Sequence, residues 1–490
     1  MTVAAFATRN RTRKIVMREL RGAPPFAADQ PVKRPRFWLG LILVLSLILS
    51  IGYNAVIPAA TAQQRQPDEN GHMLYIKKLA HGVIPIFGKP GFGPEAHQPP
   101  AYYALCVPVY LATEHLGDAA ATRAVRGVST VLAMLLIVVV YMAVIDLLGD
   151  SRLALASASL VAFLPMQVDM SAAVTNDSLI NLLFALALWR ISRLMIRLDQ
   201  VKDPSPDARS AIILALLLTA AFWTKSQAVI LVPVYIVAFC LMAYRHRASA
   251  RSTLLVGAVT IVLGLVLATP WLMRNKFLYG DLLATQAFTK EFEQTTPTTK
   301  AMLNVCARYL VHVGQATPTD PDIGDKAFKT YFWLDTRWSF ASFFGVFDSM
   351  SLFWGQDPAV KRPNAFGPMP VIYDIFLALS LVVATGLIVS LVRRKPKLTV
   401  GQSSALWIYA LMIAGVGYVF VFFNLTFFQA QGRYWFPALL PIAAFAALGL
   451  RGLLRKPAPY TVGVILLSAA LVALNAYTVW WLLPVRVAAG

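Results

Sequence analysis

Long apolar stretches recur along almost the whole chain, and no other feature restricts its fold as strongly. About 20 apolar residues are enough for a helix to cross a bilayer, and a segment in lipid must satisfy its own backbone hydrogen bonds. Hydrophobic residues make up 58% of the chain and charged residues 14%, against about 25% charged in soluble proteins. We therefore expect an all-α, polytopic transmembrane helical bundle. The twelve stretches run approximately over 37–60, 101–117, 126–148, 152–174, 178–196, 211–223, 228–244, 254–272, 369–392, 403–424, 433–450 and 460–483.

Basic residues are concentrated in short segments between these stretches. The formal net charge of +20 could suggest a nucleic-acid partner, but Lys and Arg beside apolar stretches mark the cytoplasmic side of a membrane protein. We therefore expect no nucleic-acid partner and a basic cytoplasmic N-terminal tail, residues 1–36. The internal clusters are Arg190/Arg193/Arg197/Lys202, Arg245/Arg247/Arg251, Arg393/Arg394/Lys395/Lys397 and Arg451/Arg455/Lys456.

The positions of these clusters restrict the number of crossings, because an even number must separate two cytoplasmic segments. Five apolar stretches lie between the N-terminal tail and Arg190, so one of them should not span. The stretch 101–117 follows Pro99-Pro100 and contains charged Glu114 near its end, which favours a helix at the membrane interface. About eleven crossings remain. They predict a membrane core over 37–272 that includes a first outer loop, 61–125.

The same count predicts two further regions. A second large outer loop should cover 273–368, and C-terminal transmembrane helices should cover 369–490. Of the three cysteines, Cys106 and Cys240 lie in apolar stretches, so neither a disulfide framework nor a cysteine metal site is expected.

The first outer loop contains most of the candidate chemistry. Its segment 66–79 predicts a short amphipathic helix, on which Asp68 and His72 stand one turn apart on the same face. Glu95 and His97 follow later in the loop. A structural interpretation stays open, because carboxylates at a helix start also complement the helix dipole.

Further charged residues should lie near the same outer surface. Asp177 precedes the stretch 178–196, where it could cap the helix or face a catalytic site. Lys225, Arg274 and Arg433 lie at helix ends that the crossing count places outside. A single cation there could simply reach toward the interface, but three of them opposite several acids would suit an anionic lipid phosphate.

Five short motifs follow one another along the chain. They are Pro67-Asp68-Glu69 with His72 and Tyr75, His97-Gln98-Pro99-Pro100-Ala101-Tyr102-Tyr103, Asn176-Asp177-Ser178-Leu179, Thr224-Lys225, and Gln431-Gly432-Arg433-Tyr434 with Pro437. In this order they resemble the lipid-carrier-dependent glycosyltransferases of the GT-C superfamily, which include the protein O-mannosyltransferases of glycosyltransferase family 39 and the lipid A aminoarabinose transferase. The resemblance covers about 37–300 and, in the C-terminal third, the Arg433 segment and the stretch 338–355.

The resemblance implies a reaction and a location. One sugar would pass from a polyprenyl-phosphate or polyprenyl-pyrophosphate donor to a lipid, glycan or protein acceptor, on the periplasmic face of the bacterial inner membrane. Asp68 matches the essential first-loop aspartate of the family and would act as general base. Asp177 matches the second acidic position, and Glu69 joins them as a third catalytic candidate.

The resemblance also implies the residues that would hold the donor. Lys225, Arg274, Arg433 and Gln98 would contact the phosphate, although several family members carry Lys where this chain carries Gln98. His97 matches a position near a divalent metal, and Glu95 is close enough to assist. No cofactor is required by the sequence, and a metal, if one takes part, should be Zn²⁺ or Mn²⁺. His72 and Tyr434 complete the candidate site.

Two other functions remain open. A secondary transporter can also have eleven or twelve helices, but transporters usually place ionisable groups near mid-membrane, whereas the acids here gather in outer loops. A ligase or polymerase of lipid-linked glycans would share the carrier and the topology, but would typically place its large catalytic loop later in the chain.

Overall fold

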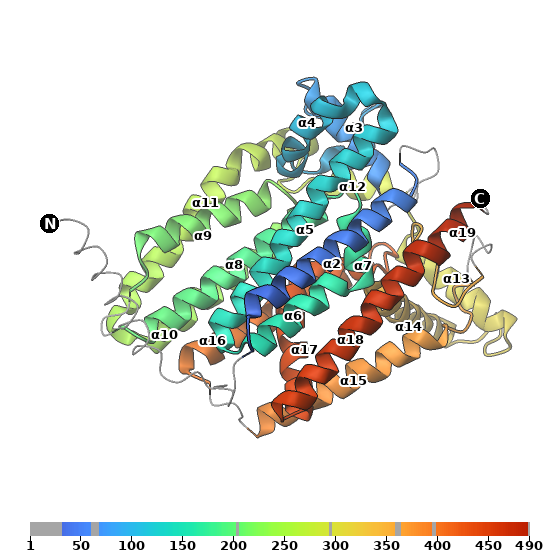
Figure 1. Cartoon of the computed structure of the whole chain (residues 1–490). Coiled ribbons are helices and arrows are strands. Elements are labelled where there is room, and N and C mark those ends of the chain that lie inside the picture. Colours follow the sequence, from blue (N-terminus) through green and yellow to red (C-terminus); the bar gives the residue numbers. More distant parts are fainter. Residues whose placement is uncertain are drawn as a thin grey trace.

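The computed structural model describes residues 32–59, 68–201, 205–293, 296–357, 364–393 and 398–488. Within these ranges the chain is helical and forms no β-strand (Figure 1); two isolated bridges join Thr298 to Phe427 and Phe347 to Leu352. The predicted all-α class is therefore confirmed. Some residues named in the sequence analysis lie outside the described ranges. They are most of the N-terminal tail, Pro67, Lys202, Arg394, Lys395 and Lys397.

The longer helices alternate with short 3-10 and π segments. Their bounds are α2 (Pro35–Val56), α3 (Glu69–Ala80), η1 (Pro94–His97), α4 (Ala101–Thr113), η2 (Glu114–Leu116), α5 (Asp118–Leu148), α6 (Ser151–Phe163), α7 (Pro165–Ser171), α8 (Asp177–Leu198), α9 (Ala208–Phe222), η3 (Ser226–Ile230), α10 (Leu231–Arg245), η4 (Arg247–Ser249), α11 (Ala250–Tyr279), α12 (Thr285–Phe292), α13 (Thr299–His312), α14 (Ile323–Phe344), α15 (Val371–Val392), α16 (Val400–Asn424), η5 (Gly432–Ala438), α17 (Leu439–Leu453), α18 (Pro457–Tyr477), η6 (Thr478–Leu482) and α19 (Leu483–Ala488).

The number of helices that can cross a membrane agrees roughly with the predicted eleven. Among the described residues, nine helices are long and apolar enough, and the bent pair α6–α7 raises this number to ten. The apolar helix α9, of 15 residues, corresponds to the predicted stretch 211–223. Helix α4, of 13 residues, is not among the candidate spans, as expected for the stretch 101–117.

One predicted span is broken. The stretch 152–174 was expected to form a single helix, but α6 and α7 meet at an angle of 63°. Leu164, between them, has an extended backbone with ψ of 113°. The cause is Pro165, which disfavours the helical conformation of the preceding residue and cannot donate a backbone hydrogen bond. After α7, the chain turns through 172–176 into α8, whose first residue is Asp177.

The connections with basic residues meet at one end of the bundle. The Asp199 carboxylate, after α8, accepts a hydrogen bond from the backbone N–H of Gly401 at the start of α16, and lies 3.5 Å from His246 after α10. Gln402 also donates to the carbonyl oxygen of Leu147 at the end of α5, at 2.8 Å. The ends of α5, α8 and α10 therefore meet the start of α16 there.

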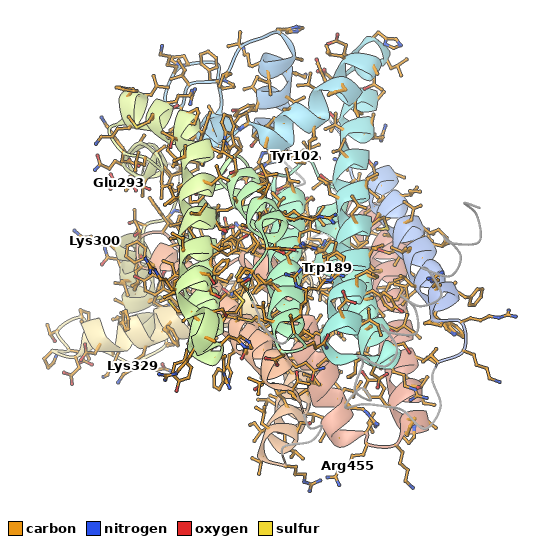
Figure 2. All side chains as sticks on the ribbon, turned by 90° about the vertical axis from the view of Figure 1, so that its left-hand side faces the viewer. Tyr102, Trp189, Glu293, Lys300, Lys329 and Arg455 are labelled. Atoms are coloured by element: carbon orange, nitrogen blue, oxygen red, sulfur yellow. The ribbon has the colours of Figure 1, made fainter. Side chains whose placement is uncertain are left out.

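The opposite end is formed by α3, α4 and α12 (Figure 1). Ala101, at the start of α4, donates a backbone hydrogen bond to Trp223, at the end of α9, at 2.9 Å. Tyr102 on α4 and Arg455 after α17 accordingly lie at opposite ends in Figure 2. The region 273–368, predicted as a large outer loop, is largely helical where it is described, with α12, α13 and α14.

The arrangement predicts the accessibility of three exposed residues. In a variant without Cys106, Cys240 and Cys306, an impermeant maleimide added to intact cells should label Lys89→Cys and Lys300→Cys. It should label Arg455→Cys only after the membrane is permeabilised, because basic connections stay in the cytoplasm. Protection of Lys300→Cys in intact cells would contradict the predicted sidedness.

Candidate active site

A cavity of about 290 Å³ lies at the α3–α4 end of the bundle. Segments far apart in the sequence line it: the start of α3, the η1 segment, the start of α8, η3, α12, the end of α16, and η5. Nine of the eleven sequence-predicted site residues line this cavity, and Glu69 and Arg274 do not. The nine are Asp68, His72, Glu95, His97, Gln98, Asp177, Lys225, Arg433 and Tyr434.

Arg433 joins Asp68 and Asp177, the two aspartates predicted to be catalytic. Its Nη2 donates to Asp68 Oδ2 at 2.7 Å, and its Nη1 lies 3.7 Å from Asp177 Oδ2. The Nε donates to Gln431 Oε1 at 2.7 Å, and the guanidinium lies 5.4 Å from the centre of the Tyr434 ring. A planar guanidinium with donors pointing in several directions can hold two carboxylates at once. Arg433 therefore connects the first outer loop to the start of α8.

Gly432 allows this arginine to come close to α14. A Cβ atom at position 432 would lie 2.1 Å from the backbone nitrogen of Phe343 on α14, closer than two such atoms can approach. The Gly432 N–H instead donates to Ser342 Oγ at 2.7 Å. The Gly432-Arg433 pair of the sequence motif thus has a structural basis, because only glycine permits this contact.

Asp177 is the first residue of α8, and its carboxylate forms an ion pair with Lys225 at the start of η3. Asn176 occupies the N-cap position, so the capping role considered for Asp177 is not observed. The side chains of Asp177 and Lys225 are only 8% and 13% exposed. Asp177 is therefore enclosed between two cations and has little surface left for a substrate.

Asp68 is the more accessible of the two aspartates, with a side chain that is 46% exposed. Its backbone adopts a left-handed conformation with φ of 60°, uncommon for residues other than glycine and strained. Burial would raise the pKa of its carboxyl, but the Arg433 guanidinium lowers it, and the pKa lies below its ordinary value. Asp68 is therefore ionised at neutral pH and open to a molecule in the cavity.

Glu69 has a different role from the one predicted. Its carboxylate receives two hydrogen bonds from Arg126 on α5, at 2.8 and 2.7 Å, and one from the backbone N–H of Val174, at 3.0 Å. Arg126 is fully buried and also donates to the carbonyl oxygens of Ile57 and Pro58. Since Glu69 points away from the cavity, the geometry does not support a direct catalytic role. The pair holds the start of α3, and thereby Asp68, against α5 and the segment before α8.

Arg274 also lies outside the cavity. Its Nη2 donates to the carbonyl oxygen of Pro85 at 2.6 Å, and its guanidinium lies 4.6 Å from the Trp271 ring centre. These contacts attach the end of α11 to the first outer loop. Arg274 therefore does not line the cavity beside Lys225 and Arg433, because the end of α11 carries it toward the loop 81–93 and not toward α8.

His97 and Gln98 belong to a hydrogen-bonded chain. His97 Nδ1 donates to the carbonyl oxygen of Pro94 at 2.9 Å, and its Nε2 accepts from Gln98 Nε2 at 3.0 Å. Gln98 Oε1 in turn accepts from Asn176 at 3.1 Å. Burial lowers the pKa of His97 to about 4, so the ring is neutral at pH 7. Gln98 thus connects the first loop to α8. Several members of the family that the motifs resemble carry Lys in place of Gln98.

The predicted metal site does not fit these contacts. Both ring nitrogens of His97 are already hydrogen-bonded within the protein. Across the described part of the chain, no three His, Cys, Asp or Glu side chains converge so that they could hold an ion. We therefore assign no step of the reaction to residues of a metal site built on His97 and Glu95.

His72 and Glu95 line the same wall of the cavity. His72 Nδ1 lies 2.8 Å from the hydroxyl of Tyr103, and burial lowers the pKa of this imidazole. Burial raises the pKa of Glu95, although nearby His72 opposes the shift. Both groups therefore tend toward their neutral forms.

Sequence reasoning missed one further wall of the cavity. It is mainly aromatic, and Phe288 stacks on Phe292 with ring centres 4.4 Å apart. Gln227 and Gln429 add amide groups. Phe420 and Phe423 lie in the apolar stretch 403–424, where nothing in the sequence distinguishes them from lipid-facing residues. The other three lie outside the apolar stretches, and no motif marks them. The aromatic members are Phe288, Phe292, Phe420, Phe423 and Phe427.

The chain is similar to known proteins in two comparisons, one with a protein-family model and one with solved structures. Residues 110–273 match the family model of dolichyl-phosphate-mannose-protein mannosyltransferases. No curated protein has a significantly similar sequence. Among solved structures, the oligosaccharyltransferase AglB from Archaeoglobus fulgidus, in complex with an inhibitory peptide and a dolichol-phosphate, is similar with a TM-score of 0.51 and 16% identity, covering 93% of this chain and 55% of that chain.

ArnT from Cupriavidus metallidurans, bound to undecaprenyl phosphate, has a TM-score of 0.50 and 16% identity, and the match covers 92% of this chain and 70% of that chain. The A. fulgidus oligosaccharyltransferase in complex with Zn and sulfate also has a TM-score of 0.50 and 16% identity, with coverage of 91% and 52%. The chain therefore spans about half the length of the archaeal enzymes. At these identities the likeness establishes a shared fold.

The Arg126–Glu69 pair can be tested by stability. Arg126→Met should lower the free energy of unfolding by roughly 3–5 kcal/mol, because it leaves the Glu69 carboxylate buried without its cation. The double variant Arg126→Met/Glu69→Gln should recover part of that loss. Chemical unfolding in detergent measures both.

Lys77→Met is the matched control for this experiment. It breaks the Lys77–Asp118 pair, which has the same 2.7 Å separation but is 33% and 65% exposed, so it should cost less than about 1 kcal/mol. Equal losses for Arg126→Met and Lys77→Met would show that the buried pair does not hold the loop.

Proposed function

We propose that this chain transfers a sugar from a polyprenyl-phosphate donor to an acceptor hydroxyl. It has the fold of the GT-C glycosyltransferases, and its residues 110–273 match the mannosyltransferase family model. One observation carries the proposal: a single cavity holds an accessible, ionised carboxylate, Asp68, beside two cations, the buried Arg433 and the largely buried Lys225. The lipid phosphates bound to AglB and ArnT support this class of donor.

Asp68 is proposed as the general base. As the acceptor oxygen forms a bond to the anomeric carbon of the sugar, the hydroxyl proton passes to the Asp68 carboxylate. The bond between the anomeric carbon and the phosphate oxygen breaks, and its electron pair leaves with the lipid phosphate. Because Asp177 is enclosed by Lys225 and Arg433, Asp68 is the aspartate that is free for the acceptor, which favours one direct displacement and inversion at the anomeric carbon.

Arg433 and Lys225 are proposed to stabilise the departing phosphate, which gains one negative charge as the bond breaks. Each cation is already shared with an aspartate, so the cavity has little positive charge in excess. A lipid monophosphate therefore suits these side chains better than a pyrophosphate, which carries more charge. Their role is charge-assisted hydrogen bonding to phosphate oxygens.

The cavity lies at the end of the bundle opposite the basic connections. With those connections in the cytoplasm, it would open on the periplasmic face of the bacterial inner membrane. The aromatic wall from α12 and α16 offers an apolar surface on which the carrier chain can lie while its phosphate reaches Arg433.

Replacing Asp68 tests the base directly. Asp68→Asn should retain folding and insertion but reduce transfer at least 10²-fold, since general-base catalysis typically contributes about 10²–10⁴-fold. The assay is sugar transfer by the purified, reconstituted chain, with circular dichroism as the folding control. Substantial activity in the Asn variant would remove Asp68 from the mechanism.

The pH dependence tests the Arg433 contact separately. Asp68 must be ionised to accept a proton, and Arg433 holds its pKa down against the effect of burial. Arg433→Gln should therefore shift the acidic limb of the kcat/KM profile to higher pH, in addition to lowering the rate. Lys89→Gln, an exposed change in the first loop, serves as control. An unshifted limb in Arg433→Gln would show that the limb does not report Asp68.

A further inference from the structure

Helix α14 has two faces with different surroundings. Its inner face supports the active-site segment, since Tyr331 donates to the carbonyl oxygen of Asn424 and Ser342 accepts from Gly432, the neighbour of Arg433. Its outer face exposes Phe328, Phe332 and Trp333, which are 48%, 58% and 47% exposed. Large aromatic side chains gathered on one exposed helix face indicate an interaction surface.

A groove of about 930 Å³ runs between this outer face and the start of α15. Its walls are mostly apolar, with Phe332 and Phe340 on α14 and Leu377 on α15. The volume lies within the usual range for ligand sites, about 300–1,000 Å³. The groove can therefore hold part of a sizeable apolar molecule.

The polar residues of the groove are few and mainly basic. Arg337 donates to the carbonyl oxygen of Gly367 and lies 4.5 Å from the Trp333 ring centre, and the acidic Asp374 lies in the first turn of α15. Lys329 is exposed at the rim, on the part of the molecule that Figure 2 shows extending to one side of the bundle. The lining thus contains two cations and one carboxylate.

The groove is continuous with a lipid-facing surface. Only 11% of an 18-residue apolar segment of α15 is buried inside the protein. Its lipid-facing character is also shown by Val371, Ile375 and Leu381, which are 71%, 49% and 60% exposed. Lipid must cover these side chains in a membrane. Since Tyr373, Asp374 and Leu377 of the groove lie in the first two turns of this helix, the groove opens at the end of a span, the level of the lipid headgroups.

We infer that the α14–α15 groove binds an anionic phospholipid of the surrounding bilayer. An acyl chain lies against Phe332, Phe340 and Leu377, and the headgroup phosphate lies near Lys329. A Trp side chain beside basic residues suits this level of the membrane. The site is separate from the cavity that holds Arg433 and does not depend on the proposed transferase activity.

Photolabelling tests the site on the full-length chain in phosphatidylcholine vesicles. Phosphatidylglycerol with a diazirine in its acyl chain is compared with the matching phosphatidylcholine probe, and labelled peptides are identified by mass spectrometry. We expect the anionic probe to label 328–340 and 369–377 about fivefold more than the neutral one, as roughly 1 kcal/mol per basic residue predicts. Lys329→Glu should remove this preference.

Lys300→Glu is the matched control, since Lys300 is an exposed lysine on α13 outside the groove and its replacement should leave the labelling unchanged. Equal labelling by both probes in the unmodified chain would contradict an anionic-lipid site. Absence of label from 328–340 would show that the groove is not filled by bilayer lipid, as expected if a water-soluble molecule occupied it.

Discussion

The contact of one guanidinium with two carboxylates organises the functional end of this protein. Arg433 lies 365 residues from Asp68 in the sequence, yet its Nη2 is 2.7 Å from that carboxylate, and its Nη1 is 3.7 Å from Asp177. Each of the three charges would be costly to bury alone. Together with Lys225, which pairs with Asp177, the charges balance, and their pairing fixes the relative positions of α3, α8 and η5. The accessible side of Asp68 is what remains available for chemistry.

Other parts of the fold serve this arrangement. The bent α6–α7 segment is followed by a short turn, after which α8 begins with Asp177 at the cavity. The buried Arg126–Glu69 pair holds the residue next to Asp68, whose backbone adopts a strained conformation. Gly432 lets the segment before Arg433 contact α14. Strain at a functional residue persists only when its surroundings hold it in place.

The sequence predicted the bundle of membrane helices well, because the length of an apolar stretch can be read directly from consecutive residues. It also predicted that Asp68, Asp177, Lys225 and Arg433 belong to one site, since these charged residues lie at helix ends and match short family motifs, and all four line one cavity. Glu69 was grouped with Asp68 because the partner that removes it from the cavity, Arg126, lies 57 residues away. Arg274 was misplaced for the same reason. No local pattern reveals a long-range pair, and the aromatic wall and the groove beside α14 depend equally on packing between distant segments.

The central claim is that the two cations of the cavity serve a lipid phosphate. Its most direct test is the binding of polyprenyl phosphate, the proposed product, to the purified chain, compared with the polyprenol that has the same hydrocarbon but no phosphate. We expect saturable binding that requires the phosphate and weakens in Lys225→Gln. Equal binding of phosphate and alcohol, unchanged in that variant, would contradict the claim.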